Sequence, residues 1–289
     1  MKVLITGASG RVGRAIYIRL CSGHEVLGYD RAPSSTADVV ASLEDADRLR
    51  DALEGIDAVV HTAALHAPHV GLRSEAEFER VNVHCTAELL RLSLAAGSRR
   101  FVFTSTTALY GAAATLPGQA GWTTEDTLPQ PRTIYHRTKL QAEQLLEAAA
   151  LRGELDVTVL RMSRCFPEPA PLMATYRLHR GVDARDVADA HAAALESSGD
   201  GFRRFIISGA TPFLPDDCRE LFESAPTVLR RRALGLVAEF ERRGWELPKT
   251  IDRVYCSYKA QSELAWNPQF GYAEVLAQLD RRSSEVLPL

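Results

Sequence analysis

The sequence predicts an α/β fold in which a doubly wound parallel sheet is joined to a smaller C-terminal lobe. Short apolar runs of strand length alternate with helical patterns from the N-terminus to about Arg161. A glycine-rich turn stands between the first apolar run and the first helical pattern. Beyond Arg161 the alternation gives way to a proline-rich stretch. Strands that alternate with helices form a parallel sheet that helices cover on both faces.

Length, charge and cysteine usage narrow the class of protein. The chain has 289 residues, 46% of them hydrophobic, and a net charge of −3, which suits one large domain with a smaller lobe. This near-neutral balance predicts neither a nucleic-acid partner nor a membrane partner. The five cysteines are widely spaced and form no Cys-x-x-Cys pair, so we expect no disulfide framework, no metal site and a cytoplasmic location. The first apolar run ends at Thr6, too early for a signal peptide or a membrane span.

The first strand and helix flank a candidate phosphate-binding turn. Residues 3–5 predict a buried strand, and residues 15–20 show a helical pattern. Between them stand Gly7, Gly10 and Gly13 in a G-x-x-G-x-x-G spacing. Glycines let the backbone turn tightly and approach a pyrophosphate, which binds at the positive N-terminus of the helix. The strand–turn–helix context therefore favours a bound dinucleotide over a glycine-rich loop without a ligand.

The second strand, over 24–30, ends on Asp30, which lies 17 residues beyond Gly13. In such units this carboxylate accepts hydrogen bonds from the adenosine ribose and repels a 2′-phosphate. We therefore expect NAD as the cofactor. Arg31 stands beside Asp30 and can serve a 2′-phosphate, which keeps NADP as the alternative.

The remaining elements follow in order along the chain. We expect helices over 43–53, 75–96, 134–152, 183–197 and 273–282, and strands over 57–61, 101–103, 157–160 and 205–207. The stretch 112–131 is rich in Gly, Pro and Thr and is expected to form a loop over the site. Asp30, Ala63, Ala64, Ser105 and Thr106 fall at or just beyond the carboxyl ends of predicted strands, where ligands of such sheets bind.

Tyr135 and Lys139 stand four residues apart near the start of a predicted helix. Positions i and i+4 share a helix face, so both side chains can reach one ligand. The ammonium favours the phenolate, so we expect it to lower the tyrosine pKa from about 10 toward neutrality. A tyrosine tuned in this way can exchange a proton with a substrate at physiological pH.

Several motifs together resemble the extended short-chain dehydrogenase/reductases, the group called NAD-dependent epimerase/dehydratases. They are the glycine turn, Thr62-Ala63-Ala64, Val81-Asn82-Val83, the stretch from Ser105 to Gly111, Tyr135-x-x-x-Lys139, residues 182–191 and residues 263–268. The resemblance implies a Rossmann-like fold, NAD binding and hydride transfer at a carbinol or carbonyl carbon, often on a sugar. It also implies a possible homodimer through the helices at 75–96 and 134–152.

The resemblance also assigns roles to individual positions. Tyr135 would be the general acid/base, Lys139 would hold the nicotinamide ribose, and Thr106 would bond the reacting oxygen, with Ser105 as a neighbour able to replace it. It implies an NAD(P)-binding domain over 1–163. A substrate-binding lobe over 164–289 would follow, from which helix 183–197 and strand 204–208 return to the first domain. The implied cofactor-binding residues are Gly7, Ser9, Gly10, Arg11, Val12, Gly13, Asp30, Arg31, Leu43, Thr62, Ala63, Ala64, Asn82, Thr104, Tyr135 and Lys139.

Two departures from the family pattern narrow the expected reaction. Dehydratases of this group place Asp-Glu directly after the catalytic threonine, whereas this chain has Thr107-Ala108, so we do not expect dehydration. Nucleotide-sugar epimerases usually carry Leu-Arg-x-x-Asn after the fifth strand, and here the asparagine position holds Arg164. Residues 161–169 and 173–176 instead resemble the uronate dehydrogenases, which bind a sugar carboxylate with arginine.

That local resemblance directs attention to three arginines as candidate substrate-binding residues beside Ser105 and Thr106. If a carboxylate is bound, then Arg164, Arg177 or Arg180 is expected to bind it, because guanidinium suits planar bidentate recognition. The alternative is that these arginines form ordinary ion pairs with Glu168, Asp183 or Asp186.

Three functions are compatible with these residues. The first is an NAD-dependent oxidoreductase acting on a sugar or sugar acid, with Tyr135 as general acid/base. The second is a nucleotide-sugar epimerase of the UDP-hexose 4-epimerase type, which oxidises and re-reduces one carbon. The third is a non-catalytic NAD-sensing protein, which the intact set of Thr106, Tyr135 and Lys139 disfavours.

Overall fold

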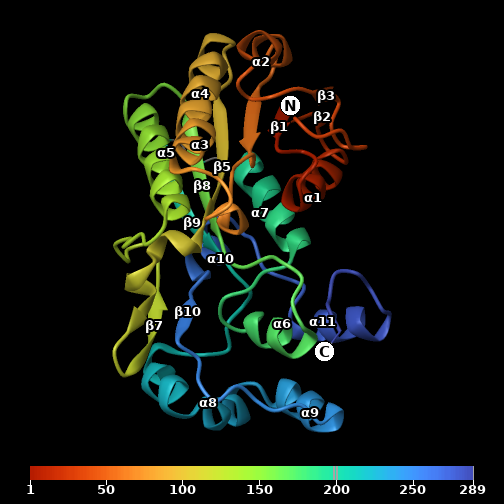
Figure 1. Cartoon of the computed structure of the whole chain (residues 1–289), viewed down its shortest axis with the longest axis vertical. Coiled ribbons are helices and arrows are strands. Elements are labelled where there is room, and N and C mark those ends of the chain that lie inside the picture. Colours follow the sequence, from red (N-terminus) through yellow and green to blue (C-terminus); the bar gives the residue numbers. More distant parts are fainter. Residues whose placement is uncertain (198, 200, 289) are drawn as a thin grey trace. The chain divides into compact units, whose positions relative to one another are not determined.

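The structure is a computed structural model that describes residues 1–197, 199 and 201–288 (Figure 1). The chain divides into two compact units, each built from segments that are separate in sequence. The first unit comprises Met1–Leu109, Pro131–Arg161 and Val187–Phe205, and the second comprises Tyr110–Gln130, Met162–Asp186 and the residues from Ile206 onward.

A seven-stranded parallel sheet organises the first unit. Its strands are β1 (Lys2–Thr6), β2 (Glu25–Asp30), β3 (Val39–Val40), β4 (Ala58–His61), β5 (Arg100–Thr106), β8 (Asp156–Met162) and β9 (Phe202–Ile207). They are ordered β3-β2-β1-β4-β5-β8-β9. Strand β1 lies between β2 and β4, with Val3 beside Val26 of β2 and Ala58 of β4, and the three strands run in the same direction. The chain therefore winds outward from β1 in both directions, which brings the carboxyl ends of β1, β2, β4 and β5 to one edge.

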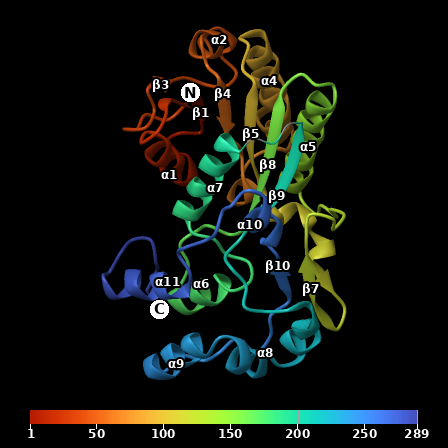
Figure 2. The ribbon, with the colours of Figure 1, turned by 180° about the vertical axis from the view of Figure 1, so that it is seen from behind.

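Helices cover both faces of this sheet (Figures 1 and 2). On one face α4 (Cys85–Ala95) packs against α2 (Ala46–Ala52) and α5 (Ile134–Leu151). On the other face lie α1 (Arg11–Leu20) and α7 (Ala184–Glu196), which an ion pair between Arg19 and Asp189 joins. The core beneath α2, α4 and α5 contains Leu4, Leu49, Val59, Leu89, Leu92, Phe101, Leu146, Ala149 and Val157.

A three-stranded sheet and several helices form the second unit. Its strands are β6 (Thr115–Leu116), β7 (Gln119–Thr123) and β10 (Arg253–Tyr255), and its helices are α6 (Ala170–Tyr176), α8 (Cys218–Arg232), α9 (Leu234–Arg243), α10 (Tyr258–Glu263) and α11 (Tyr272–Asp280). β7 is the middle strand, antiparallel to β6 and parallel to β10. The core of this unit includes Met173, Leu221, Leu229, Phe240 and Val275.

The predicted doubly wound α/β fold is confirmed, but several predicted elements differ from the structure. The loop expected over 112–131 is wrong, because this segment contains β6 and β7 with Gly118 turning between them at a φ of +73°. The single helix expected over 75–96 is α3 (Glu75–Glu79), a π-helical turn (Arg80–His84) and α4. The prediction missed β3, α6 and β10. It also missed the short 3-10 helices at Ala67–His69, Thr107–Tyr110, Ala112–Ala114 and Pro215–Asp217.

In the described part of the chain, no helix combines the length and apolar character needed to cross a membrane. All five cysteines are free thiols.

Candidate active site

The last three residues of β5 each have a polar side-chain partner. Thr104 bonds the His191 ring through its hydroxyl at 2.7 Å and accepts the Lys139 ammonium on its carbonyl oxygen at 2.6 Å. The Thr106 side chain hydrogen-bonds Tyr135. Because β5 extends to Thr106 rather than ending near Phe103, these residues have the fixed alternation of a strand.

Tyr135 and Lys139 lie in the first turns of α5, as the sequence predicts. The Thr133 side chain caps this helix by accepting from the His136 amide. Tyr135 packs beside a small apolar cluster that includes Leu65 and Phe78. The first unit therefore brings together Thr106, Tyr135 and Lys139, which is the arrangement needed for proton exchange with a bound hydroxyl or carbonyl group.

The electrostatics of this pair differ from the sequence-based expectation. We expected Lys139 to lower the pKa of Tyr135, but burial raises the pKa of Tyr135 to about 12, and among the described residues Thr106 is the group that lowers it. The physical reason is the placement of Lys139. Its ammonium bonds the Thr104 carbonyl and lies 3.9 Å from the centre of the Phe103 ring, and burial lowers its own pKa to about 7.

Ser105 has a partner that the sequence reading did not anticipate. Its hydroxyl is buried and donates to the Glu143 carboxylate on α5. Arg161 binds the same carboxylate in a buried ion pair at 2.6 Å. Of the two adjacent hydroxyl residues, Thr106 therefore serves Tyr135, and Ser105 serves an internal network.

The glycine-rich turn has the geometry that a dinucleotide requires. Gly7 has a φ of +76°, and a Cβ there would lie 2.6 Å from the Ala63 amide nitrogen. A Cβ on Gly13 would lie 2.0 Å from the Gly7 carbonyl oxygen. Gly10 is the N-cap of α1, and neither a side-chain cap nor an acidic residue in the first turn occupies this helix end. The helix N-terminus therefore has donors suited to a pyrophosphate.

Asp30 fastens this turn to the end of β2. Its two carboxylate oxygens accept one bond each, from the Ser9 amide at 2.9 Å and from the Ala32 amide at 2.8 Å. Each oxygen keeps a lone pair that can accept from a ribose hydroxyl. Arg31 is exposed beside it. The residues present at this edge fit an NAD molecule.

Replacing Gly10 by alanine tests the fit of the turn to NAD. Gly10 has a φ of −72° and a ψ of 163°, which alanine adopts freely, and the nearest protein atom to an added Cβ is 3.3 Å away. We expect an unchanged thermal unfolding midpoint but an NAD dissociation constant raised about 10- to 100-fold, because an added methyl in a close contact costs about 1–3 kcal/mol. Titration calorimetry with NAD measures this. Gly23→Ala is the control, because a Cβ added there would meet no other part of the protein within 4 Å. Equal NAD affinity in both variants would contradict the fit.

The other predicted cofactor residues have different local roles. Thr62 donates to the Thr6 carbonyl at 2.8 Å, which holds the Thr62–Ala64 segment beside the glycine turn. Asn82 is buried, and its amide bonds both backbone groups of Leu65 and the Thr138 hydroxyl, so it positions a loop instead of offering a free side chain. Leu43 is half-buried and packs on the sheet core. Arg11 and Val12 begin α1.

The three candidate substrate arginines lie in the second unit and differ in accessibility. Arg177 is buried and bonds Asp183 at 3.0 Å, so the ion-pair alternative describes it. Arg164 pairs with Glu168 but keeps 45% of its side chain exposed. Arg180 lies over the Tyr176 ring at 4.3 Å and 3.6 Å from Asp252, with 25% of its side chain exposed. Arg164 and Arg180 therefore remain able to meet an anion.

Sequence reasoning missed two buried residues at this edge, Glu143 and His191. Burial lowers the pKa of His191 to about 4, so its ring is neutral, and its Nδ1 bonds the Val187 carbonyl oxygen at 2.7 Å. The sequence offers only weak signals for them: Glu143 follows Lys139 by one helical turn, and His191 lies in an alanine-rich helix. No cluster of three or more metal-ligating side chains occurs among the residues that the structure describes.

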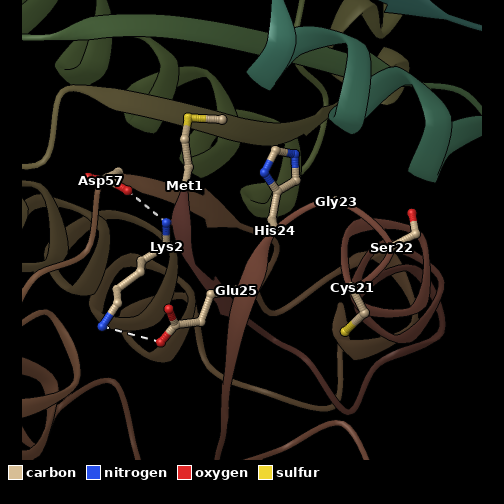
Figure 3. Close-up of a pocket in the computed structure, with 8 residues that line it drawn as sticks. All are labelled: Met1, Lys2, Cys21, Ser22, Gly23, His24, Glu25 and Asp57. Atoms are coloured by element: carbon tan, nitrogen blue, oxygen red, sulfur yellow. Dashed lines mark hydrogen bonds and ion pairs between the residues drawn. The ribbon is translucent and has the colours of Figure 1, made fainter.

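A separate surface hollow lies at the opposite, amino-terminal ends of β1 and β2 (Figure 3). It is lined by Met1, Lys2, Cys21, Ser22, Gly23, His24, Glu25 and Asp57. Lys2 is paired within this hollow. Its ammonium lies 3.2 Å from the Glu25 carboxylate, and its backbone amide donates to Asp57 at 2.7 Å. Because the glycine turn follows the other end of β1, this hollow is not part of the candidate active site.

Comparison with known proteins places the chain in a family. The model described as the NAD dependent epimerase/dehydratase family matches residues 3–170. The chain belongs to this family. Membership in the NAD dependent epimerase/dehydratase family confirms the resemblance drawn from the sequence motifs.

Individual relatives of this epimerase/dehydratase family member differ in what they bind. Sterol demethylase protein B of Methylococcus capsulatus is 32% identical over 228 residues, which are 74% of this chain and 62% of that protein, so the chain spans less than two thirds of its length. A short-chain dehydrogenase/reductase superfamily protein from Agrobacterium tumefaciens with bound NAD has a TM-score of 0.73 at 24% identity, covering 98% of this chain and 97% of that one. MoeE5, solved with UDP-glucuronic acid and NAD, has a TM-score of 0.71 at 26% identity, covering 98% and 99%.

Proposed function

We propose that this chain is an NAD-dependent oxidoreductase that transfers a hydride at a carbinol or carbonyl carbon of a sugar or sugar-acid substrate. The observation that carries the proposal is the convergence of Thr106, Tyr135 and Lys139 beside the end of β5. The glycine turn and Asp30 support it, because they stand at the carboxyl ends of neighbouring strands of the same sheet.

Each residue of the site would have its own role in the reaction. NAD, when bound, supplies the hydride acceptor. Tyr135, as phenolate, takes the proton of the substrate hydroxyl while a carbonyl forms, and returns a proton in the reverse direction. Thr106 donates to oxygen as negative charge develops. The Lys139 ammonium has three donors and can bind ribose hydroxyls.

The proposed substrate class rests on charge in the second unit and on the relatives. Arg164 and Arg180 have partly exposed guanidinium groups, which suit a carboxylate or a phosphate. MoeE5 carries both groups in its bound UDP-glucuronic acid. We assign cofactor binding to the first unit and substrate recognition to the second. The local likeness to uronate dehydrogenases, the homodimer and the cytoplasmic location stay predictions.

Two other activities are favoured by particular observations. An epimerase of nucleotide sugars is the main alternative, because UDP-glucose 4-epimerase from Thermotoga maritima has the same fold, with a TM-score of 0.72 at 21% identity. A sterol substrate is the second, because the Methylococcus relative is a sterol demethylase protein.

A substrate panel with the bound nucleotide identified tests these proposals. Purified protein is incubated with NAD and free sugars, uronates, UDP-sugars or hydroxysterols, while NADH absorbance and sugar isomers are followed. NADH release with a sugar or uronate supports net oxidation, and isomer exchange of a UDP-sugar without NADH release supports epimerisation. NADH release with sterols alone would refute the sugar assignment. Tight NAD binding with no turnover would favour an NAD-sensing protein.

Replacing Asp30 by alanine tests the cofactor assignment. We expect the NAD dissociation constant to rise about 10- to 100-fold, because two charge-assisted hydrogen bonds to the ribose are lost, while NADP affinity falls less or improves. Competition between the two nucleotides measures this. Asp38→Ala is a matched control, since Asp38 also holds local backbone by accepting from the Gly28 amide at 2.7 Å. Equal loss of NAD and NADP in the Asp30 variant would contradict the assignment.

A further inference from the structure

Glu143 is a buried carboxylate one helical turn beyond Lys139 on α5, and the proposed mechanism does not use it. It has no exposed surface. Arg161 of β8 donates to it from two nitrogens, with 2.6 Å between Nη2 and Oε2 and 3.1 Å between Nε and Oε1. Arg204 of β9 lies 3.3 Å from Oε2, and the Ser105 hydroxyl donates to Oε1. Helix α5 and three neighbouring strands therefore meet at one carboxylate.

Packing stability alone is a weak reason for such a group. A buried ion pair contributes little or nothing beyond what apolar side chains of similar volume would contribute, because both charges lose their hydration. The pair between Glu143 and Arg161 is almost completely buried, with 0% and 2% of the two side chains exposed. The placement of Glu143 therefore indicates a role in the candidate active site.

Ser105, which donates to the Glu143 carboxylate, lies between the two β5 residues that hydrogen-bond Lys139 and Tyr135. The residue before it, Thr104, accepts the Lys139 ammonium on its carbonyl oxygen at 2.6 Å. The residue after it, Thr106, bonds Tyr135. Because a strand allows little independent rotation of consecutive residues, holding the Ser105 side chain fixes both neighbours.

The charge of Glu143 also acts on Lys139. The positive charge of Lys139 acts on His61 of β4 and on His66 in the loop that follows. Burial lowers the pKa of His61 to about 3, so its ring is neutral at pH 7, and burial also lowers the pKa of His66. Burial lowers the pKa of Lys139, and Glu143 raises it in opposition. Of the acidic groups in the described structure, Glu143 is the one that acts on this ammonium.

We propose that Glu143 is a positioning residue for the Tyr135–Lys139 pair, which holds the end of β5 through Ser105 and places a carboxylate one helical turn from Lys139. The inference rests on the proposed function, since the pair it positions is the proton-handling pair of that reaction. It predicts that removing the Glu143 charge alters Lys139, whereas removing the Ser105 hydroxyl alters turnover.

The effect of the Glu143 charge on Lys139 is tested by Glu143→Gln in protein labelled with ¹³C-lysine. The chain has four lysines, Lys2, Lys139, Lys249 and Lys259, so the Lys139 signal is assigned by its loss in Lys139→Arg. We expect the pKa of Lys139, about 7 in the wild type, to fall by about one to two units, which is the usual effect of losing a nearby opposite charge. Glu147→Gln is the matched control, because Glu147 lies on the same helix and pairs with Arg204 at 3.1 Å. In that variant Lys139 is expected to titrate as in the wild type.

The hydrogen bond between Ser105 and Glu143 is tested by Ser105→Ala, which leaves the Glu143–Arg161 ion pair intact. We expect kcat to fall about tenfold or more, because small misplacements of catalytic groups are costly, while NAD affinity and the thermal midpoint hold. If Glu143→Gln does not fold, this kcat decides the proposal. If the wild type turns over no substrate, the proposed function fails, and the Lys139 titration still decides the role of Glu143. An unchanged Lys139 titration in folded Glu143→Gln, or wild-type kcat in Ser105→Ala, would overturn it.

Discussion

Replacing Tyr135 by phenylalanine is expected to lower kcat by about 10³-fold or more while NAD affinity is retained. The substitution removes only the phenol oxygen, which is the atom that would exchange a proton with the substrate. Helix α5 and the apolar contacts of the ring with Leu65 and Phe78 remain. Steady-state kinetics on the active substrate, combined with NAD titration calorimetry, separates the loss of chemistry from a loss of binding.

Tyr29→Phe is the matched control for this experiment. Tyr29 is buried on β2, and its hydroxyl donates to the Ser42 carbonyl at 2.8 Å. Losing that bond is expected to destabilise the fold by about 1 kcal/mol and to leave kcat unchanged. Retained turnover in Tyr135→Phe would remove Tyr135 from the mechanism, and an equal loss in both variants would show that the effect is not specific to the site.

The cofactor edge of the sheet could be predicted because its determinants are local in sequence. Gly7 and Gly13 stand between a strand and a helix, and the structure requires glycine at both positions for reasons of φ or close contact. Asp30 ends β2, and its bond to the Ser9 amide shows why an acid at that point serves the turn. The spacing of the motif thus reports a three-dimensional constraint directly.

The polar network behind the site could not be predicted, because its partners are brought together only by the fold. Ser105 and Glu143 are 38 residues apart, and Glu143 and Arg161 are 18 apart. The choice between Ser105 and Thr106 also depends on the length of β5, since consecutive strand residues point to opposite sides. The pKa of Tyr135 was misjudged for a related reason, because the depth of burial and the direction of the Lys139 side chain are properties of the packed structure.

Replacing Thr106 by valine is expected to lower kcat by about 10²-fold, the usual cost of losing one donor to a developing oxyanion. Valine keeps the shape of threonine but removes the hydroxyl that bonds Tyr135. Thr107→Val is the control, because Thr107 is also buried and this variant makes the same substitution at the next position in the chain. Circular dichroism and thermal unfolding are expected to match the wild type in both variants.

The pH profile of Thr106→Val gives a second, independent signature. Burial raises the pKa of Tyr135 to about 12, and the hydrogen bond from Thr106 lowers it, so losing that bond raises the pKa further. At any pH below that pKa, each unit of increase reduces the phenolate fraction tenfold. The ascending limb of kcat/KM for oxidation should therefore move to higher pH in Thr106→Val and stay in place in Thr107→Val. A uniform loss of rate, with the limb at its wild-type pH, would mean that Thr106 acts on the substrate oxygen and not through the ionisation of Tyr135.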